Sequence, residues 1–259
     1  MEVSKKVEGK KIKRTDLLKF QKSLNEQFLE ILTQKNNTLS EGQQSEDTLG
    51  LSSYFRELNL FVSLKELQSI ATKVNYENTV RTKSWILGFN QDHGRIYTIF
   101  NLNKVFSMLI DNQTDFDIPP LSMNSNIIYL KNNLEENFGL LMEDFKLEYT
   151  ADFSLILDHK VNEEGLINWS LASGVDFDTF VKKENMSEAE WNLISKVNEL
   201  SKSNKKHQIG IYPEYKDDDK YNILALMVGK VYLDSFGQKP LFVLNLKNLT
   251  KFLINVSPF

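Results

Sequence analysis

The 259-residue chain contains no cysteine. Disulfide frameworks, cysteine-based zinc sites, iron–sulfur clusters and cysteine nucleophiles are therefore excluded. No apolar run approaches the roughly 18–20 residues that a membrane-spanning helix needs, so we expect no direct membrane insertion. The opening residues also lack the apolar stretch of a secretory signal peptide, and a cytoplasmic location is expected.

Arginine is scarce as well, at four of the 31 basic residues, and the formal net charge of the chain is −4. Residues 1–14 hold six basic and two acidic residues, so this segment carries +4 and the remaining chain carries −8. Nucleic-acid-binding domains usually present clustered arginines on a basic surface, and so we expect no nucleic-acid partner. We interpret residues 1–14 as a disordered, solvated tail in preference to a site for nucleic acid or anionic lipid.

The motifs of nucleotide binding and hydrolysis are missing too. Neither G-x-G-x-x-G, nor G-x-x-x-x-G-K-[ST], nor the G-x-S-x-G nucleophile elbow occurs. The histidines His93, His159 and His207 are far apart in the sequence, and nothing predicts that they converge on a metal. The run Asp217–Asp219 lacks the alternating ligands and the glycine of a calcium loop, so it is interpreted as a solvated charge run. We therefore expect no enzyme, with no catalytic residue, no cofactor and no metal.

Hydrophobic periodicity divides the chain into segments. Residues 15–36 predict a helix with one apolar face, which Thr15 or Asp16 would cap. The polar, aperiodic residues 37–50 indicate a linker. Short β-rich runs follow, with a hairpin signal between the third and the fourth. These runs are 53–55, 58–62, 85–90, 95–100, 126–130, 137–142, 145–149, 223–228, 230–233 and 241–244.

Only short helices are expected beyond residue 50. They are predicted at 103–109 and 247–254, and a longer one at 187–200, where Ser187 and Glu190 form a capping box. Many short strands with tight turns and few long helices predict a mainly β chain, with antiparallel sheets that close into small barrels. Strict alternation of strands and helices is absent, so a doubly wound parallel sheet is not expected.

One segment resembles a known protein family. Trp85–Leu102 (WILGFNQDHGRIYTIFNL) is similar to the signature hairpin of CheW-like chemotaxis adaptors, W-[VIL]-x-G-x-x-N-x-R-G-x-[VIL]-x-P-[VIL]-x-D-L. Leu60–Ile70 and Asn137–Phe145 resemble the elements before and after that hairpin. Val231–Leu249 resembles the closing strand pair and helix of the family.

These matches cover about 51–150 and 221–257. The N-terminal helix and Phe252–Phe259 look more like one branch, the PilI-type adaptors of type IV pilus (twitching) chemosensory systems. The resemblance implies a CheW-like domain over 51–259 with two small five-stranded antiparallel β-barrels, SH3-like in type, packed on a shared apolar core. It also implies that 151–220 is a helical insertion, about whose role the family says nothing.

The resemblance implies that the protein is an adaptor without catalytic activity. Such an adaptor couples the cytoplasmic tip of a methyl-accepting chemoreceptor to the regulatory domain of a CheA-like histidine kinase, in arrays at the inner membrane. For this branch, control of twitching motility is expected. An alternative is a β-barrel protein-interaction module whose binding is carried by the insertion at 151–220.

The resemblance also implies where the partners bind. The expected contact residues lie in the signature hairpin: Gly88, Asn90, Asp92, His93, Gly94 and Arg95. Three positions depart from the family pattern, because His93 replaces an arginine, Thr98 a proline and Asn101 an aspartate. Histidine is shorter than arginine and mostly neutral near pH 7, so a bidentate arginine contact is not expected at His93.

Overall fold

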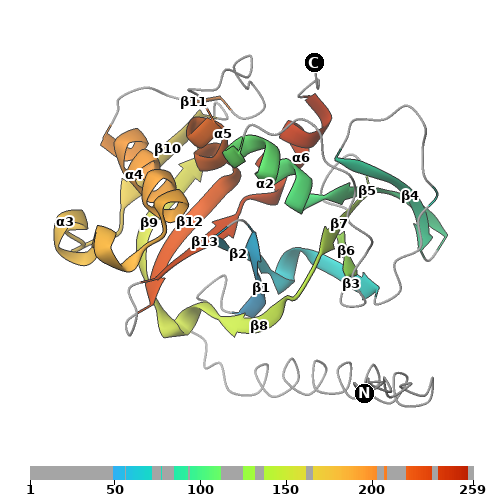
Figure 1. Ribbon diagram of the computed structural model, residues 1–259, viewed down its shortest axis with the longest axis horizontal. Coiled ribbons are helices and arrows are strands. Elements are labelled where there is room, and N and C mark those ends of the chain that lie inside the picture. Colours follow the sequence, from blue (N-terminus) through green and yellow to red (C-terminus); the bar gives the residue numbers. More distant parts are fainter. Residues whose placement is uncertain are drawn as a thin grey trace, which may run out of the picture. The chain divides into compact units, whose positions relative to one another are not determined.

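Two β-sheets and a set of short helices make up the computed structural model (Figure 1). The structure describes residues 49–55, 57–71, 77, 85–92, 94–111, 125–131, 137–161, 166–202, 207–208, 220–234 and 239–255. All of them belong to one unit, Asp47–Phe259. The predicted tail 1–14, the predicted helix 15–36 and His93 lie outside the described residues.

The larger sheet has eight strands. Their spatial order is β11 (His207–Gln208), β10 (Leu166–Leu171), β9 (Phe153–Val161), β12 (Val228–Asp234), β13 (Pro240–Leu244), β2 (Leu58–Ser63), β1 (Leu49–Phe55) and β8 (Lys146–Tyr149). Neighbouring strands are antiparallel except for β13 and β2, which run parallel with Phe242 opposite Leu60. This parallel pair joins the two ends of the described chain within one sheet.

The smaller sheet has five strands. Their order is β3 (Leu67–Ala71), β6 (Asn126–Leu130), β7 (Phe138–Met142), β5 (Arg95–Asn101) and β4 (Ile86–Asp92). Again one pair is parallel, β5 with β7, where Ile99 lies opposite Gly139. Glu77 forms an isolated bridge with Phe89 on the outer edge of β4.

Helices pack against these sheets. They are α2 (Leu102–Asp111), α3 (Phe177–Phe180), α4 (Glu188–Lys202), α5 (Lys220–Met227) and α6 (Leu246–Asn255), with single 3-10 turns η1 (Leu64–Glu66), η2 (Thr150–Asp152) and η3 (Lys183–Asn185). The capping box predicted for α4 is confirmed. The Glu190 amide donates to Ser187 Oγ at 3.2 Å, and the Ser187 amide donates to Glu190 Oε2 at 2.9 Å.

Two expectations from the sequence are corrected. The strand predicted at 223–228 is wrong, because Ile223–Met227 forms most of α5 and is buried on all sides. A short segment that is apolar all round has no periodicity to separate a buried helix from a buried strand. The stretch 151–220 is helical only in part, since it also supplies β9, which lies between β10 and β12 inside the larger sheet.

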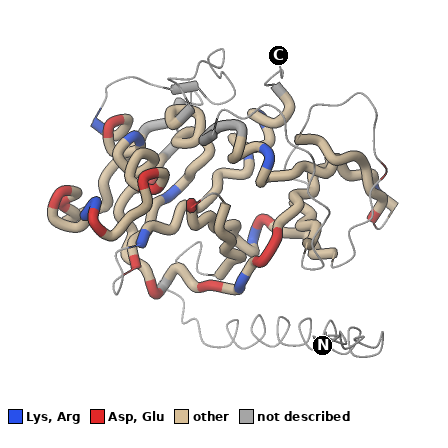
Figure 2. The backbone as a smooth tube through the Cα atoms, in the orientation of Figure 1, with Lys and Arg blue, Asp and Glu red and all other residues tan. Residues whose placement is uncertain are grey.

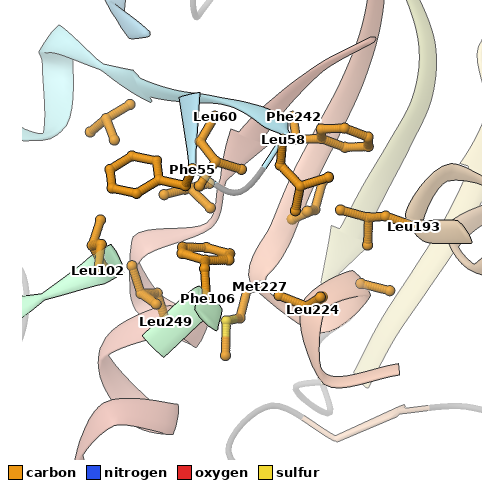
Figure 3. Packing of buried hydrophobic residues seen from close by; sticks show 14 of the residues in the cluster. Phe55, Leu58, Leu60, Leu102, Phe106, Leu193, Leu224, Met227, Phe242 and Leu249 are labelled. Carbon is orange, nitrogen blue, oxygen red and sulfur yellow. The ribbon is translucent and has the colours of Figure 1, made fainter. Parts of the chain in front are cut away.

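The main hydrophobic core joins both sheets to the helices (Figure 3). Figure 3 shows side chains from β1, β2, β13, α2, α4, α5 and α6 that converge there: Phe55, Leu58, Leu60, Phe242, Leu102, Phe106, Leu193, Leu224, Met227 and Leu249. Each sheet also carries a smaller cluster on its opposite face, around Tyr97 and Tyr129 in one case and Phe61 and Leu241 in the other. Each sheet thus has its own small core beside the shared one.

The expectation of a mainly β chain is confirmed, with differences from the two barrels that were expected. The sheets have eight and five strands, and each contains a parallel pair. Within the described residues, no backbone ladder joins the end strands of either sheet. The end strands of the smaller sheet, β3 and β4, are instead connected by side chains, because Ser69 Oγ donates to Asp92 Oδ2 at 3.3 Å.

Candidate partner-binding hairpin

The predicted hairpin is present as β4 and β5, with Asp92 opposite Arg95 at its tip (Figure 1). Gly94 lies in the turn at φ +76°, a left-handed conformation that glycine adopts without the steric cost of a Cβ. A Cβ added there would meet no atom within 4 Å. The turn is therefore open to solvent, and its glycine is required by the backbone conformation and not by crowding.

Asn90 and Asp92 lie on the face of the hairpin that carries the small core of this sheet. Asn90 Nδ2 donates to the hydroxyl of Tyr129 on β6, and Asp92 accepts from Ser69 on β3. The rings of Tyr97 and Tyr129 pack beside them with centroids 4.5 Å apart. These contacts engage the side chains of Asn90 and Asp92 within the sheet.

The electrostatics of this face keep Tyr129 neutral. Burial raises the pKa of the Tyr129 phenol, and the nearby Asp92 carboxylate raises it further, while the hydrogen bond from Asn90 partly opposes this shift. A buried phenol that remains protonated and accepts a hydrogen bond is a structural element of this small core.

Gly88 shapes the path of β4. The register between the two strands shifts between Ile86 and Gly88, which marks a β-bulge, and Gly88 has φ +150°. Its position is buried. Glycine is favoured at such a bulge because other residues rarely adopt this φ value.

The opposite face of the hairpin is exposed and partly apolar. It consists of Phe89, Gln91, Ile96 and Thr98, which we call the outward face. Phe89 lies opposite Thr98 and Gln91 opposite Ile96, so Phe89 and Ile96 are diagonal neighbours. Phe89 is 39% exposed and Ile96 65% exposed, although both lie on the side of the sheet that is buried further along the strand at Phe100.

Phe89 and Ile96 are absent from the contact residues implied by the family pattern. The signal that identifies them is the strand alternation of side chains, which assigns Asn90 and Asp92 to one face and Phe89 and Gln91 to the other. The pattern alone does not say which face is covered. Only the contacts of Asn90 and Asp92 with strands β6 and β3 decide it.

Charge is nearly absent from this sheet (Figure 2). Asp92 and Arg95 are the only charged residues in strands β3 to β7. Figure 2 shows charged positions gathered on α3, α4 and β8 instead. The exposed Arg95 therefore provides a single cation at the tip, next to an outward face of uncharged side chains.

Of the other candidate residues of the sequence, the structure describes two. His159 lies on β9 and His207 on β11, while His93 and Asp217–Asp219 are outside the described residues. In the part of the chain that the structure describes, no three His, Asp or Glu side chains are placed to hold a metal ion. The described helices also include none long and apolar enough to cross a membrane.

Comparison with known proteins finds similarity in structure. No family model matches the chain, and no curated protein matches it in sequence. Among solved structures, the chain is similar to the scaffolding protein TtCheW from Thermoanaerobacter tengcongensis, at 12% identity and a TM-score of 0.43. The match covers 82% of this chain and 94% of that protein. A likeness of this degree transfers neither a family nor a function to the chain.

Proposed function

We propose that the protein is a CheW-like chemosensory adaptor. It binds the regulatory domain of a CheA-like histidine kinase and the cytoplasmic tip of a methyl-accepting chemoreceptor, and it acts by binding alone, without catalysis or a cofactor. The observation that supports this function is the outward face of the β4–β5 hairpin. The segment whose sequence resembles the family's signature exposes Phe89 and Ile96 next to Arg95.

The physical argument concerns burial. Two exposed apolar side chains on neighbouring strands lose contact with water when a partner covers them, and such anchors commonly carry most of the binding energy of an interface. The tip, with Arg95 and Gly94, supplies polar contacts at the rim. Moderate affinity is sufficient for an adaptor, because many copies act together in an array.

We further propose that the protein works in a type IV pilus system. The support is the PilI-like character of residues 15–36 and 252–259. In that role it would lie in the cytoplasm, at receptor arrays on the inner membrane. Deletion of its gene should abolish twitching motility and leave flagellar swimming intact, whereas a swimming defect alone would assign it to another system.

Titration calorimetry tests the adaptor function directly. The purified protein is titrated with the regulatory domain of the CheA-like kinase from the same organism. Saturable binding in the micromolar range is expected. A folded protein that does not bind this domain contradicts the proposal.

The second candidate function places binding on the α3–α4 region. Phe180 on α3 is 44% exposed, between Phe177 and Val181, which are buried. Deletion of 151–220 would remove β9 from the larger sheet and is a poor test of this region. Phe180→Asp changes only the exposed side chain. Loss of partner binding in this variant, with binding intact in an Ile96→Asp variant, would favour the second function.

A further inference from the structure

Asn245 connects two parts of the structure through its side chain. Its Oδ1 accepts a hydrogen bond from the Asn248 amide at 3.0 Å, so Asn245 is the N-cap of α6. Its Nδ2 lies 2.9 Å from His159 Nε2 on β9. Its backbone amide donates to Met227 O at 2.8 Å, which fixes the residue at the start of the helix.

The cap determines the protonation state of the imidazole. Since Oδ1 of Asn245 must face the helix to accept from Asn248, the amide group Nδ2 faces His159 and donates to it. His159 Nε2 must then carry a lone pair, and the proton of the neutral ring resides on Nδ1. A second proton, on Nε2, would point at the hydrogens of Asn245 Nδ2.

The packing around His159 leaves little space for the imidazole ring to rotate away from Asn245. A Cβ at Gly229 would lie 3.3 Å from His159 Cε1, so the ring sits close to the backbone of β12. Trp169 on β10 packs at its edge, with ring centroids 5.0 Å apart. Rotation of the imidazole would therefore displace β12 or Trp169. The easier response to a second proton is rotation of the Asn245 amide, which removes Oδ1 from Asn248.

Burial is the main influence that disfavours the charged ring. Burial lowers the pKa of His159 below its ordinary value of about 6.5. The backbone at Gly229 favours the charged form, as do Asp158, which precedes His159 in β9, and the backbone at Val228, whereas Lys230 on β12 opposes it. Trp169 and Asn245, which also contact the ring, do not titrate. A histidine whose pKa is lowered on folding binds more protons in the unfolded chain, so stability is lost as the pH falls below about 6.5.

Helix α6 also contacts the base of the hairpin. Near its other end, the carbonyl oxygen of Leu253 accepts a hydrogen bond from Trp85 Nε1 at 3.4 Å. Trp85 immediately precedes β4, and its own carbonyl oxygen accepts from the Asn101 amide at the end of β5. The N-cap of α6 thus contacts β9, and its last turn contacts the residue that precedes the hairpin.

We propose that the His159–Asn245 contact is a pH-sensitive latch, which holds α6 in its capped form at neutral pH and above and releases its first turn when His159 takes up a proton. The latch is internal to the fold and does not depend on the identity of the partners.

Nuclear magnetic resonance of the full chain, labelled with 15N, tests the latch. At pH 7.5 we expect the Nδ1–H tautomer of His159, with a titration midpoint below 6.5. Between pH 7.5 and 5.5 the exchange protection of the Asn248 and Leu249 amides should fall about fivefold, the factor that corresponds to loss of one N-cap. The Nε2–H tautomer, or protection that does not change with pH, would overturn the proposal.

Two substitutions sharpen this test. Asn245→Asp keeps the cap but places a carboxylate against the ring, so the His159 midpoint should rise above 6.5 and the loss of protection should disappear. A midpoint that stays below 6.5 in this variant contradicts the latch. His159→Gln should abolish the pH response, while the control His207→Gln on β11 should retain it; the opposite pattern assigns the response to His207.

Discussion

Ser69 Oγ donates a hydrogen bond to Asp92 Oδ2 at 3.3 Å, and this contact connects the two end strands of the five-stranded sheet. Strand β3 carries Ser69 and strand β4 carries Asp92, and no backbone ladder joins them among the described residues. Tyr97 on β5 adds a second side-chain contact with β3, because its hydroxyl donates to Gln68 at 3.1 Å. Side chains thus bring the sheet towards a barrel and turn Asp92 inwards.

Removal of this contact should loosen the sheet without affecting the outward face. Ser69→Ala is expected to lower the free energy of unfolding by about 0.5–1.5 kcal/mol, the usual net value of one hydrogen bond. Asp92→Asn retains an acceptor oxygen for Ser69 and should be closer to wild type. Urea denaturation of the three proteins measures the differences. A loss in Asp92→Asn that exceeds the loss in Ser69→Ala would contradict this role of Asp92.

We expect the contributions of Asn90 and Tyr129 to the free energy of unfolding to be coupled, as they should be if Asn90 is an interior residue. Asn90→Ala leaves the buried Tyr129 hydroxyl without this hydrogen bond, which we expect to cost about 1–3 kcal/mol. Tyr129→Phe removes the other partner, and the double variant should lose less than the sum of the two single losses. A double-mutant cycle by denaturation measures the coupling. Additive losses would separate Asn90 from Tyr129.

Sequence motifs predicted correctly those elements that depend on interactions between residues close together in the chain. The turn through Gly94 and the capping box of Ser187 and Glu190 were predicted because each rests on residues two or three positions apart. Ile223–Met227 was wrongly predicted as a strand, because a segment that is buried on every side has no hydrophobic periodicity that distinguishes a helix from a strand. Strand β9 was not predicted, although it lies inside a sheet.

These local signals did not predict which strands that are distant in the sequence pair with each other. The parallel pairing of Phe242 with Leu60 joins segments that are far apart in the sequence. No turn motif connects these segments, so the sequence contains no local signal that predicts the pairing. The same limit applied to the candidate site. Alternation separates Phe89 from Asn90, but the covered face is decided by Tyr129 and Ser69, which are contributed by other strands.

Gly94 should be required for its backbone conformation alone. Gly94→Ala is expected to cost about 1–2 kcal/mol, because an L-residue at φ +76° is strained while no atom obstructs its Cβ. Gly94→Asn should cost less, since asparagine tolerates the left-handed region better. Thermal unfolding compares the two variants. Equal melting temperatures for wild type and Gly94→Ala would refute the requirement.

The contribution of one buried carboxyl group, that of Glu190, to the free energy of unfolding should decrease as the pH rises. Burial raises the pKa of Glu190, with Glu57 adding to the shift and the hydrogen bonds from Ser187 opposing it. A raised carboxyl pKa means that the folded chain binds more protons, so its contribution is complete below about 4.3 and is lost as the pH rises through the folded pKa.

Glu190→Gln keeps a capping box but cannot ionise. Its stability relative to wild type should therefore increase as the pH is raised from 4 to 7. Denaturation curves at several pH values measure this trend, with Glu188→Gln as an exposed carboxyl control on the same helix. A pH-independent difference between Glu190→Gln and wild type would show that the ionisation of Glu190 is not linked to folding.

The most direct test of the account is the affinity of two matched variants for the regulatory domain of the CheA-like kinase. Ile96 on the hairpin and Leu147 on β8 are both exposed apolar residues, so replacing either by aspartate should change stability by no more than about 0.5 kcal/mol. Titration calorimetry should show at least a tenfold weaker Kd for Ile96→Asp, and the wild-type Kd for Leu147→Asp. Wild-type affinity in a folded Ile96→Asp variant would contradict the central claim that the hairpin's outward face binds the kinase.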